Sequence, residues 1–114
     1  MTFPSGVASM KVTGQNIVDD GGNPQFGVIE FDPGAIQFSP TGTPPTMFEN
    51  PVIADVQNGV MTPVTVPDSH HAQASNFTYT VTVKLEGRSS VVYPGIVISI
   101  DTFPSGTVDI AQLL

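Results

Sequence analysis

The clearest pattern in the chain is the alternation of apolar and polar residues over positions 77–86. On an extended chain, one face of this segment carries only large apolar side chains, those of Phe77, Tyr79, Val81, Val83 and Leu85. The opposite face is rich in threonine. Because successive side chains of a strand point to opposite faces, this period of two predicts a long half-buried strand, which the turn residues 86–88 then end.

A second pattern predicts a hairpin. Two apolar runs, residues 52–57 and 60–66, flank the dipeptide Asn58-Gly59. Asn and Gly both accept the positive φ angles of a type I′ turn, which is the turn that joins antiparallel strands most tightly. Pro63 lies within the return strand and lacks the N–H that a central strand needs, so this strand is expected at a sheet edge or with a bulge.

Shorter runs between glycine and proline clusters predict further strands at residues 7–13, 26–32, 35–39, 89–93 and 96–100. The clusters at 19–24, 40–45 and 94–95 are expected to be turns or loops. The nearly continuous apolar run 96–100 suits the centre of a sheet. No window shows helical spacing. The predicted fold is all-β: a single antiparallel β-sandwich of about seven to nine short strands, residues 10–114, with extended N-terminal (1–9) and C-terminal arms.

Composition agrees with this architecture and limits the chemistry. The chain of 114 residues is expected to form one domain, and 11% of its residues are charged against about 25% in average soluble proteins. It has 11 glycines and 11 prolines, which suits short strands joined by tight turns. The absence of cysteine excludes disulfides and thiolate metal sites.

The formal charge of −7 disfavours nucleic acids and anionic membranes as partners, because both carry negative charge. A protein partner is expected instead. No window reaches the about 18 apolar residues of a membrane span, and the first residues do not resemble a signal peptide, so synthesis without export is expected.

Candidate chemistry in the sequence is sparse. His70 and His71 are adjacent and would point to opposite sides of an extended chain, and the group Asp68, Ser69 and His70 has the residue types of a hydrolase triad without its motif. The acidic turn at 19–20 lacks the spacing of a calcium loop. We therefore expect no enzyme activity, no catalytic or metal-binding residue and no cofactor.

One covalent alternative concerns three residues in different predicted strands. Some sandwich domains join a first-strand lysine to a last-strand acid or amide beside a buried carboxylate. Lys11, Asp109 and Glu30 occupy roughly corresponding places in this chain. A surface lysine and two solvated acids are the simpler expectation.

Three stretches together resemble a known family. MKVTGQNIVDDGGNPQFGVIEFDPG (10–34), FTYTVTVKLEG (77–87) and GTVDIAQLL (106–114) resemble, in this order, small β-sandwich domains in virion proteins of tailed bacteriophages, especially of actinobacterial hosts. Phe77 departs from the pattern, since relatives often have tryptophan there. The three stretches are spread along the chain from residue 10 to residue 114.

The resemblance implies a structural virion protein, made in the bacterial host cytoplasm and located on the capsid surface. The expected role is that of a capsid decoration or minor capsid protein that binds and stabilises the shell. Its partners would be the major capsid protein and copies of itself, a trimer being one possible assembly. Alternatives are a minor tail or baseplate protein and a carbohydrate-binding module for attachment to the host surface. The lack of tryptophan argues against sugar binding.

Candidate contact residues lie near both ends of the chain. The pentapeptide Thr-Phe-Pro-Ser-Gly occurs at 2–6 and at 102–106, which is ordinary turn chemistry or a device that exposes a phenylalanine to a neighbour. The closing segment 107–114 would either complete the chain's own sheet or reach a second subunit. The predicted capsid or subunit contacts are Phe3, Phe103, Val108, Ile110, Leu113 and Leu114.

Overall fold

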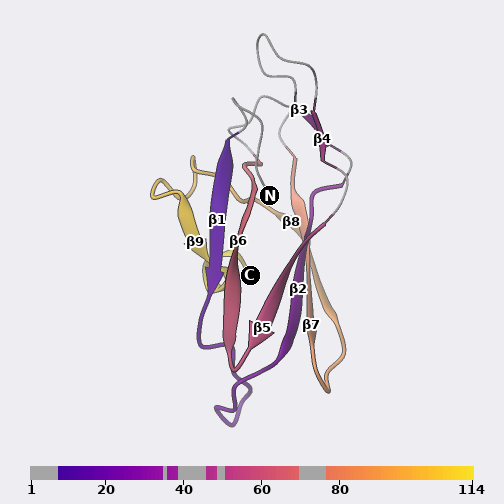
Figure 1. Ribbon diagram of the computed structural model, residues 1–114, viewed down its shortest axis with the longest axis vertical. Helices are drawn as coiled ribbons and strands as arrows, with labels where there is room; N and C mark the ends of the chain where they lie inside the picture. The colour runs from indigo at the N-terminus through magenta and orange to yellow at the C-terminus, as the bar shows by residue number, and fades with distance from the viewer. Residues whose placement is uncertain (1–7, 35, 39–45, 49–50, 70–76) are drawn as a thin grey trace.

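A computed structural model describes residues 8–34, 36–38, 46–48, 51–69 and 77–114, and its main feature is one seven-stranded sheet (Figure 1). The strand order in this sheet is β8-β7-β2-β5-β6-β1-β9. The strands are β1 (Ser9–Gly14), β2 (Gly27–Asp32), β5 (Val52–Gln57), β6 (Val60–Pro67), β7 (Tyr79–Leu85), β8 (Val91–Ile96) and β9 (Thr107–Asp109). A separate two-stranded sheet pairs β3 (Ile36–Phe38) with β4 (Thr46–Phe48), and a single helical turn, α1 (Ile110–Leu113), follows β9.

The all-β prediction is confirmed, whereas two stacked sheets of a sandwich are not. The main sheet is mixed, because β9 runs parallel to β1 while the other neighbours are antiparallel. It curls into a half-barrel, so that one sheet supplies both walls of the core (Figure 1). The chain thus closes its core by bending a single sheet.

The curl originates at the hairpin of β5 and β6. These strands pair only beside their turn, Val56 with Met61 and Gln57 with Val60. Beyond that point β5 pairs with β2 and β6 pairs with β1, and the two arms diverge (Figure 1). The four strands β8, β7, β2 and β5 therefore form one wall, and β6, β1 and β9 form the other.

Apolar side chains from both walls fill the space between them. Ile29, Phe31, Tyr79 and Val81 come from one wall and are fully buried, as are Met10, Val12, Met61, Val66 and Val108 from the other. Each such side chain contributes about 1.5–3 kcal/mol of burial free energy. The predicted alternation in the strand at 77–86 is confirmed, since Tyr79 and Val81 face this core and Lys84 faces solvent.

Two local predictions in the hairpin are also confirmed. Asn58 has φ 51° and Gly59 has φ 78°, the positive values that a type I′ turn requires. Pro63 lies in a β-bulge: between the pairs Val12–Val64 and Gly14–Met61, strand β6 has one more residue than β1. The extra residue places the proline where its missing N–H interrupts no regular ladder.

Two predictions about the segment after β7 are wrong. The expected turn at 94–95 is a bulge within one continuous strand, β8, with Gly95 at φ 71°. The expected central strand at 96–100 is not a strand beyond Ile96. Its apolar residue Ile98 is nevertheless fully buried, because the chain crosses here from one wall to the other. Strand β8 lies at the edge of the sheet.

The C-terminal segment is not an extended arm. It forms β9 next to β1, with Val12 opposite Val108, and then the short helix α1. Asp109 caps this helix in a capping box with Gln112. The chain end is therefore part of the wall formed by β6, β1 and β9.

The packing of β2 against β7 predicts a large effect of Gly27→Ala. Gly27 has φ 153°, and a Cβ there would collide with the Lys84 carbonyl oxygen and lie 2.8 Å from Leu85 Cα. We expect a loss of at least about 2 kcal/mol in the free energy of unfolding, measured by urea denaturation.

Gly87→Ala is the matched control. Gly87 also has a positive φ, 74°, but a Cβ there would meet no atom within 4 Å. Only the backbone strain of about 1 kcal/mol is expected. Equal losses in the two variants would contradict the role of close packing at Gly27.

Candidate interaction surface

The predicted contact residues near the C-terminus differ in their exposure. Val108 and Ile110 are buried in the chain's own core, with 1% and 5% exposure. Phe103 and Leu113 are partly buried and pack against that core. Leu114 is 43% exposed and is thus the predicted contact in this segment that is most open to a partner. Phe3 lies outside the described residues, and a partner contact by any of the six stays a prediction.

Backbone pairing with β1 holds this segment on its own subunit, and cap hydrogen bonds within the segment hold its final helical turn. The Lys11 N–H donates to the Gly106 carbonyl oxygen at 3.0 Å. The Asp109 carboxylate accepts from the Ala111 N–H at 2.9 Å, and the Gln112 side chain accepts from the Asp109 N–H at 3.0 Å. Of the two alternatives for residues 107–114, the structure has the segment complete its own sheet.

A buried polar group ties the crossing segment to the end of β6. The fully buried Asp68 carboxylate accepts from the Ile100 N–H at 2.8 Å. Ser69 exchanges two hydrogen bonds with Ile98: its N–H donates to the Ile98 carbonyl oxygen at 2.9 Å, and its hydroxyl accepts from the Ile98 N–H at 3.1 Å. Asp68 and Ser69, two of the three triad-like residues, thus form hydrogen bonds with backbone groups of the crossing segment. His70 and His71 lie outside the described residues.

Tyr79 joins the two walls beside this group. Its hydroxyl donates to the carbonyl oxygen of Pro67, the last residue of β6. Burial, and secondarily the negative charge of Asp68, raise the pKa of Tyr79 above its usual value. The phenol therefore stays protonated and remains a donor.

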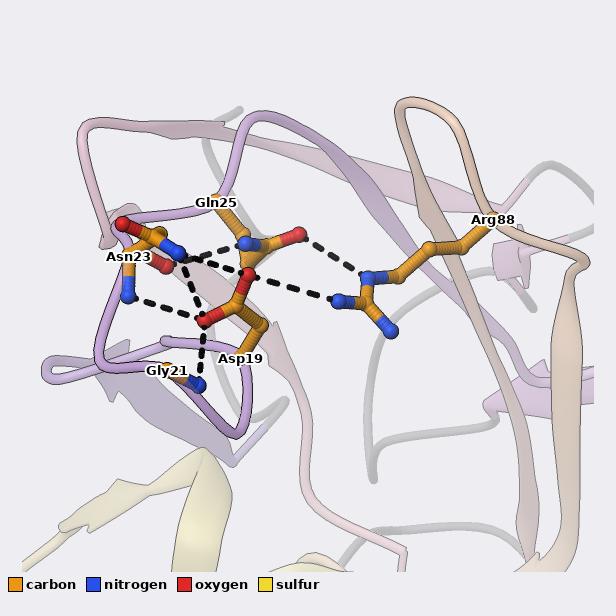
Figure 2. A network of polar contacts seen from close by, with 5 residues as sticks. All are labelled: Asp19, Gly21, Asn23, Gln25 and Arg88. Carbon is orange, nitrogen blue, oxygen red and sulfur yellow. Dashed lines mark hydrogen bonds and ion pairs between the residues drawn. The ribbon is translucent and has the colours of Figure 1, made fainter.

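A second polar network holds the loop between β1 and β2 (Figure 2). One oxygen of Asp19 accepts from the N–H groups of Gly21 and Asn23, each at 2.9 Å. Arg88, in the turn between β7 and β8, places Nη2 at 3.6 Å from the other Asp19 oxygen and donates from Nε to the Gln25 side chain. The network connects two turns that are far apart in the sequence.

These contacts favour the plain-turn interpretation of the acidic loop. Asp19 is surrounded by N–H donors and a guanidinium group, and these compete with a cation for its oxygens (Figure 2). Within the described part of the chain, no group of three or more His, Cys, Asp or Glu residues could hold a metal ion.

The three residues of the isopeptide alternative are not brought together. Lys11 and Asp109 lie on the neighbouring strands β1 and β9. Glu30 lies on β2 in the opposite wall, where its carboxylate is 3.0 Å from the Lys84 ammonium group. The Glu30 carboxylate therefore does not lie beside Lys11 and Asp109, as the isopeptide alternative would require.

Exposed apolar side chains are a feature that the sequence analysis did not single out. Ile53 on β5 and Val92 on β8 are 54% and 56% exposed, and strand register places them in one cross-sheet row with Glu30 and Thr82 between them. Val91, next to Val92, is 47% exposed. The available signal was the run Val-Val-Tyr at 91–93 without any charged neighbour on either side for two residues.

Two hollows lie on the described surface. One, of about 390 Å³, lies where β5 and β6 diverge and is lined by Pro51, Val52, Pro63, Val64 and Thr65. The other, of about 400 Å³, has Phe26, Gly27 and Val28 on one side and Asp55 and Gln57 on the other. The residues that line them are a mixture of apolar and polar side chains.

Comparison with known proteins identifies no relative: no family model, no curated protein and no solved structure matches the chain. Among the described residues, no helix is long and apolar enough to cross a membrane.

The Asp19 network predicts a pH-dependent contribution to stability. Hydrogen bonds from Asn23, first from its backbone and then from its side chain, lower the pKa of Asp19 below the usual 3.8. A carboxyl whose pKa is lower in the folded state stabilises the fold above its unfolded pKa and loses this contribution as the pH falls through the folded value. Thermal unfolding should therefore show that Asp19→Asn lowers the midpoint at pH 7 and that the difference from wild type shrinks at acidic pH.

Asp20→Asn is the matched control because it removes the same charge one residue away, outside the hydrogen bonds that Asp19 accepts. If both variants shifted the midpoint equally at every pH, the Asp19 network would not be the cause.

Proposed function

We propose that this chain is a structural virion protein of a tailed bacteriophage, most simply a capsid decoration or minor capsid protein that binds and stabilises the shell. Its partners are the major capsid protein and copies of itself. The motifs at 10–34, 77–87 and 106–114 carry the resemblance on which the phage assignment rests.

The structural observation that supports this role is the distribution of exposed large apolar side chains over a surface with few charges. These side chains are Val18, Phe26, Ile53, Val60, Val91, Val92, Ile100 and Leu114. They lie on several elements, from the loop before β2 to the residue after α1. Several modest contacts suit a small protein that touches several neighbours in an assembly, where valency multiplies weak binding.

Three of these side chains surround the turn between β5 and β6. Val60 follows the turn directly, and Val18 and Phe26 flank the loop that Gly59 reaches through two backbone hydrogen bonds, to Ile17 and to Gln25. We name Val18, Phe26 and Val60 the tip. In the proposed function, the tip is available to the shell surface in addition to the two chain ends.

The finer description of the fold also belongs to this proposal. The two walls of the half-barrel correspond to the two layers of the sandwich that the resemblance implies, with the β5–β6 hairpin shared between them. Superposition on an experimental structure of a phage decoration domain would test this correspondence.

The alternatives differ in what the chain contacts. A minor tail or baseplate protein would use the same kind of surface against a tail component. A carbohydrate-binding module has less support, because sugar faces usually stack on tryptophan or tyrosine rings. The chain has no tryptophan, Tyr79 is fully buried and Tyr93 is partly buried, although the ring of Phe26 is exposed. Saturable binding on a glycan array would favour it.

Location in the particle is the decisive measurement. An antibody to this chain should label intact particles of the encoding phage over the whole head surface in immunogold electron microscopy. Label restricted to the tail would favour the tail alternative. Particles without label would contradict a structural role.

Deletion of residues 1–6 tests the predicted N-terminal contact. Strand β1 begins at Ser9, so the deletion removes no described strand residue and should leave the unfolding midpoint near that of wild type. We expect the truncated protein to lose binding to phage heads that were prepared without this protein, measured by co-sedimentation.

Leu114→Ser is the companion variant for the other chain end, since the Leu114 side chain is exposed and the residue caps α1 through its backbone N–H, which serine retains. Full binding by the truncated protein would exclude the N-terminal contact. Full binding by both variants would shift the shell contact to the tip.

A further inference from the structure

Strand β8 is one end of the seven-stranded sheet. Among the strands that the structure describes, it pairs on one side only, with β7. Val91 and Val92 are 47% and 56% exposed. Successive residues of a strand point to opposite faces, so both faces of β8 are open to solvent at this position.

Exposed edges in monomeric proteins carry charges or proline, are bulged, very short or covered. In β8, Pro94 and the bulge at 94–95 protect the second half of the strand, whereas residues 91–93 have none of these features. Residues 89–97 contain no charged side chain. The nearest cation, Arg88, is turned toward Asp19 and Gln25 (Figure 2). The bulge in β8 begins only after Tyr93. The opposite edge, β9, has three residues and is followed by α1.

We propose that two copies of this chain associate through antiparallel pairing of their β8 strands, about a two-fold axis at Val92. This pairing places Val92 opposite Val92 of the partner subunit and Val91 opposite Tyr93 of the partner subunit. Every central pair is then apolar, which favours cross-strand association. The segment from Val91 to Tyr93 is thus self-complementary under two-fold symmetry.

A second copy fits this edge for an electrostatic reason as well. Two chains of charge −7 repel each other over most of their surfaces. The uncharged segment 89–97 is where they approach without placing like charges opposite one another. The pairing also provides hydrogen-bond partners for the backbone groups along the edge of β8. The neighbouring strand then partly covers both faces of β8.

The β8 dimer specifies how copies of the chain associate in the proposed function, and it rests on that proposal only for the role of this association. A monomer that still binds phage heads would overturn the inference and leave the proposed function in place. A dimer that binds no phage head would contradict the proposed function and leave the β8 dimer in place.

Cysteine cross-linking tests the register directly, because the chain has no cysteine of its own. Residues directly opposite in an antiparallel pair have Cα atoms about 4.5–5.5 Å apart, within the range that a disulfide spans. Under mild oxidation, Val92→Cys should form a covalent dimer. Ile53→Cys is the matched control: it is about as exposed as Val92 and lies in the same row, but three strands away on β5, where the proposed two-fold axis brings no partner residue opposite it, so it should stay uncross-linked.

Sedimentation equilibrium tests the association without a covalent bond. Wild-type protein should be dimeric, and Val92→Lys should be monomeric because it places two ammonium groups opposite each other. Ile53→Lys should remain dimeric. Since both side chains are more than half exposed, both variants should keep the unfolding behaviour of a folded subunit. A wild-type monomer, or an assembly that persists in Val92→Lys, would overturn the proposal.

Discussion

The limited pairing between β5 and β6 is the constraint on which the structure depends. The two strands share only the residue pairs next to their turn, and from there each continues beside a different neighbour. One sheet thereby supplies both walls of the core. At the far end, the Tyr79 hydroxyl donates to the carbonyl oxygen of Pro67, and the chain crosses between the walls beside Asp68. The core is thus held by a turn at one end and by buried hydrogen bonds at the other.

Asp68 and Asp19, two acidic residues considered above as candidates for catalysis or calcium binding, accept hydrogen bonds from backbone N–H groups. Asp68 is buried and accepts from a backbone N–H, and Asp19 organises a turn and receives Arg88 from a distant one. A buried carboxylate with backbone donors stabilises a local conformation, which is costly to lose in a chain of this size.

A half-barrel also leaves an edge that a closed barrel would not have. The two ends of the sheet differ: β9 is short and followed by a capped helix, whereas β8 is longer and apolar on its exposed side. The two ends of the sheet therefore differ in how easily another strand could pair with them. Among the described strands, the curl that closes the core leaves β8 with β7 as its one neighbour, and this is the edge at which we propose self-association.

The sequence by itself determined the local elements. The Asn58-Gly59 turn, the irregular pairing at Pro63 and the inward face of β7 follow from φ preferences, a missing N–H and a period of two, all of which act within a few residues. The choice of a bulge over a sheet edge for Pro63 came from the tertiary structure. Only the tertiary structure decided that β8 continues through Pro94-Gly95, that β9 runs parallel to β1 with Val108 in the core, and which apolar residues remain exposed. These features depend on strand partners that are distant in the sequence, and local pattern contains no information on which edge a strand will meet.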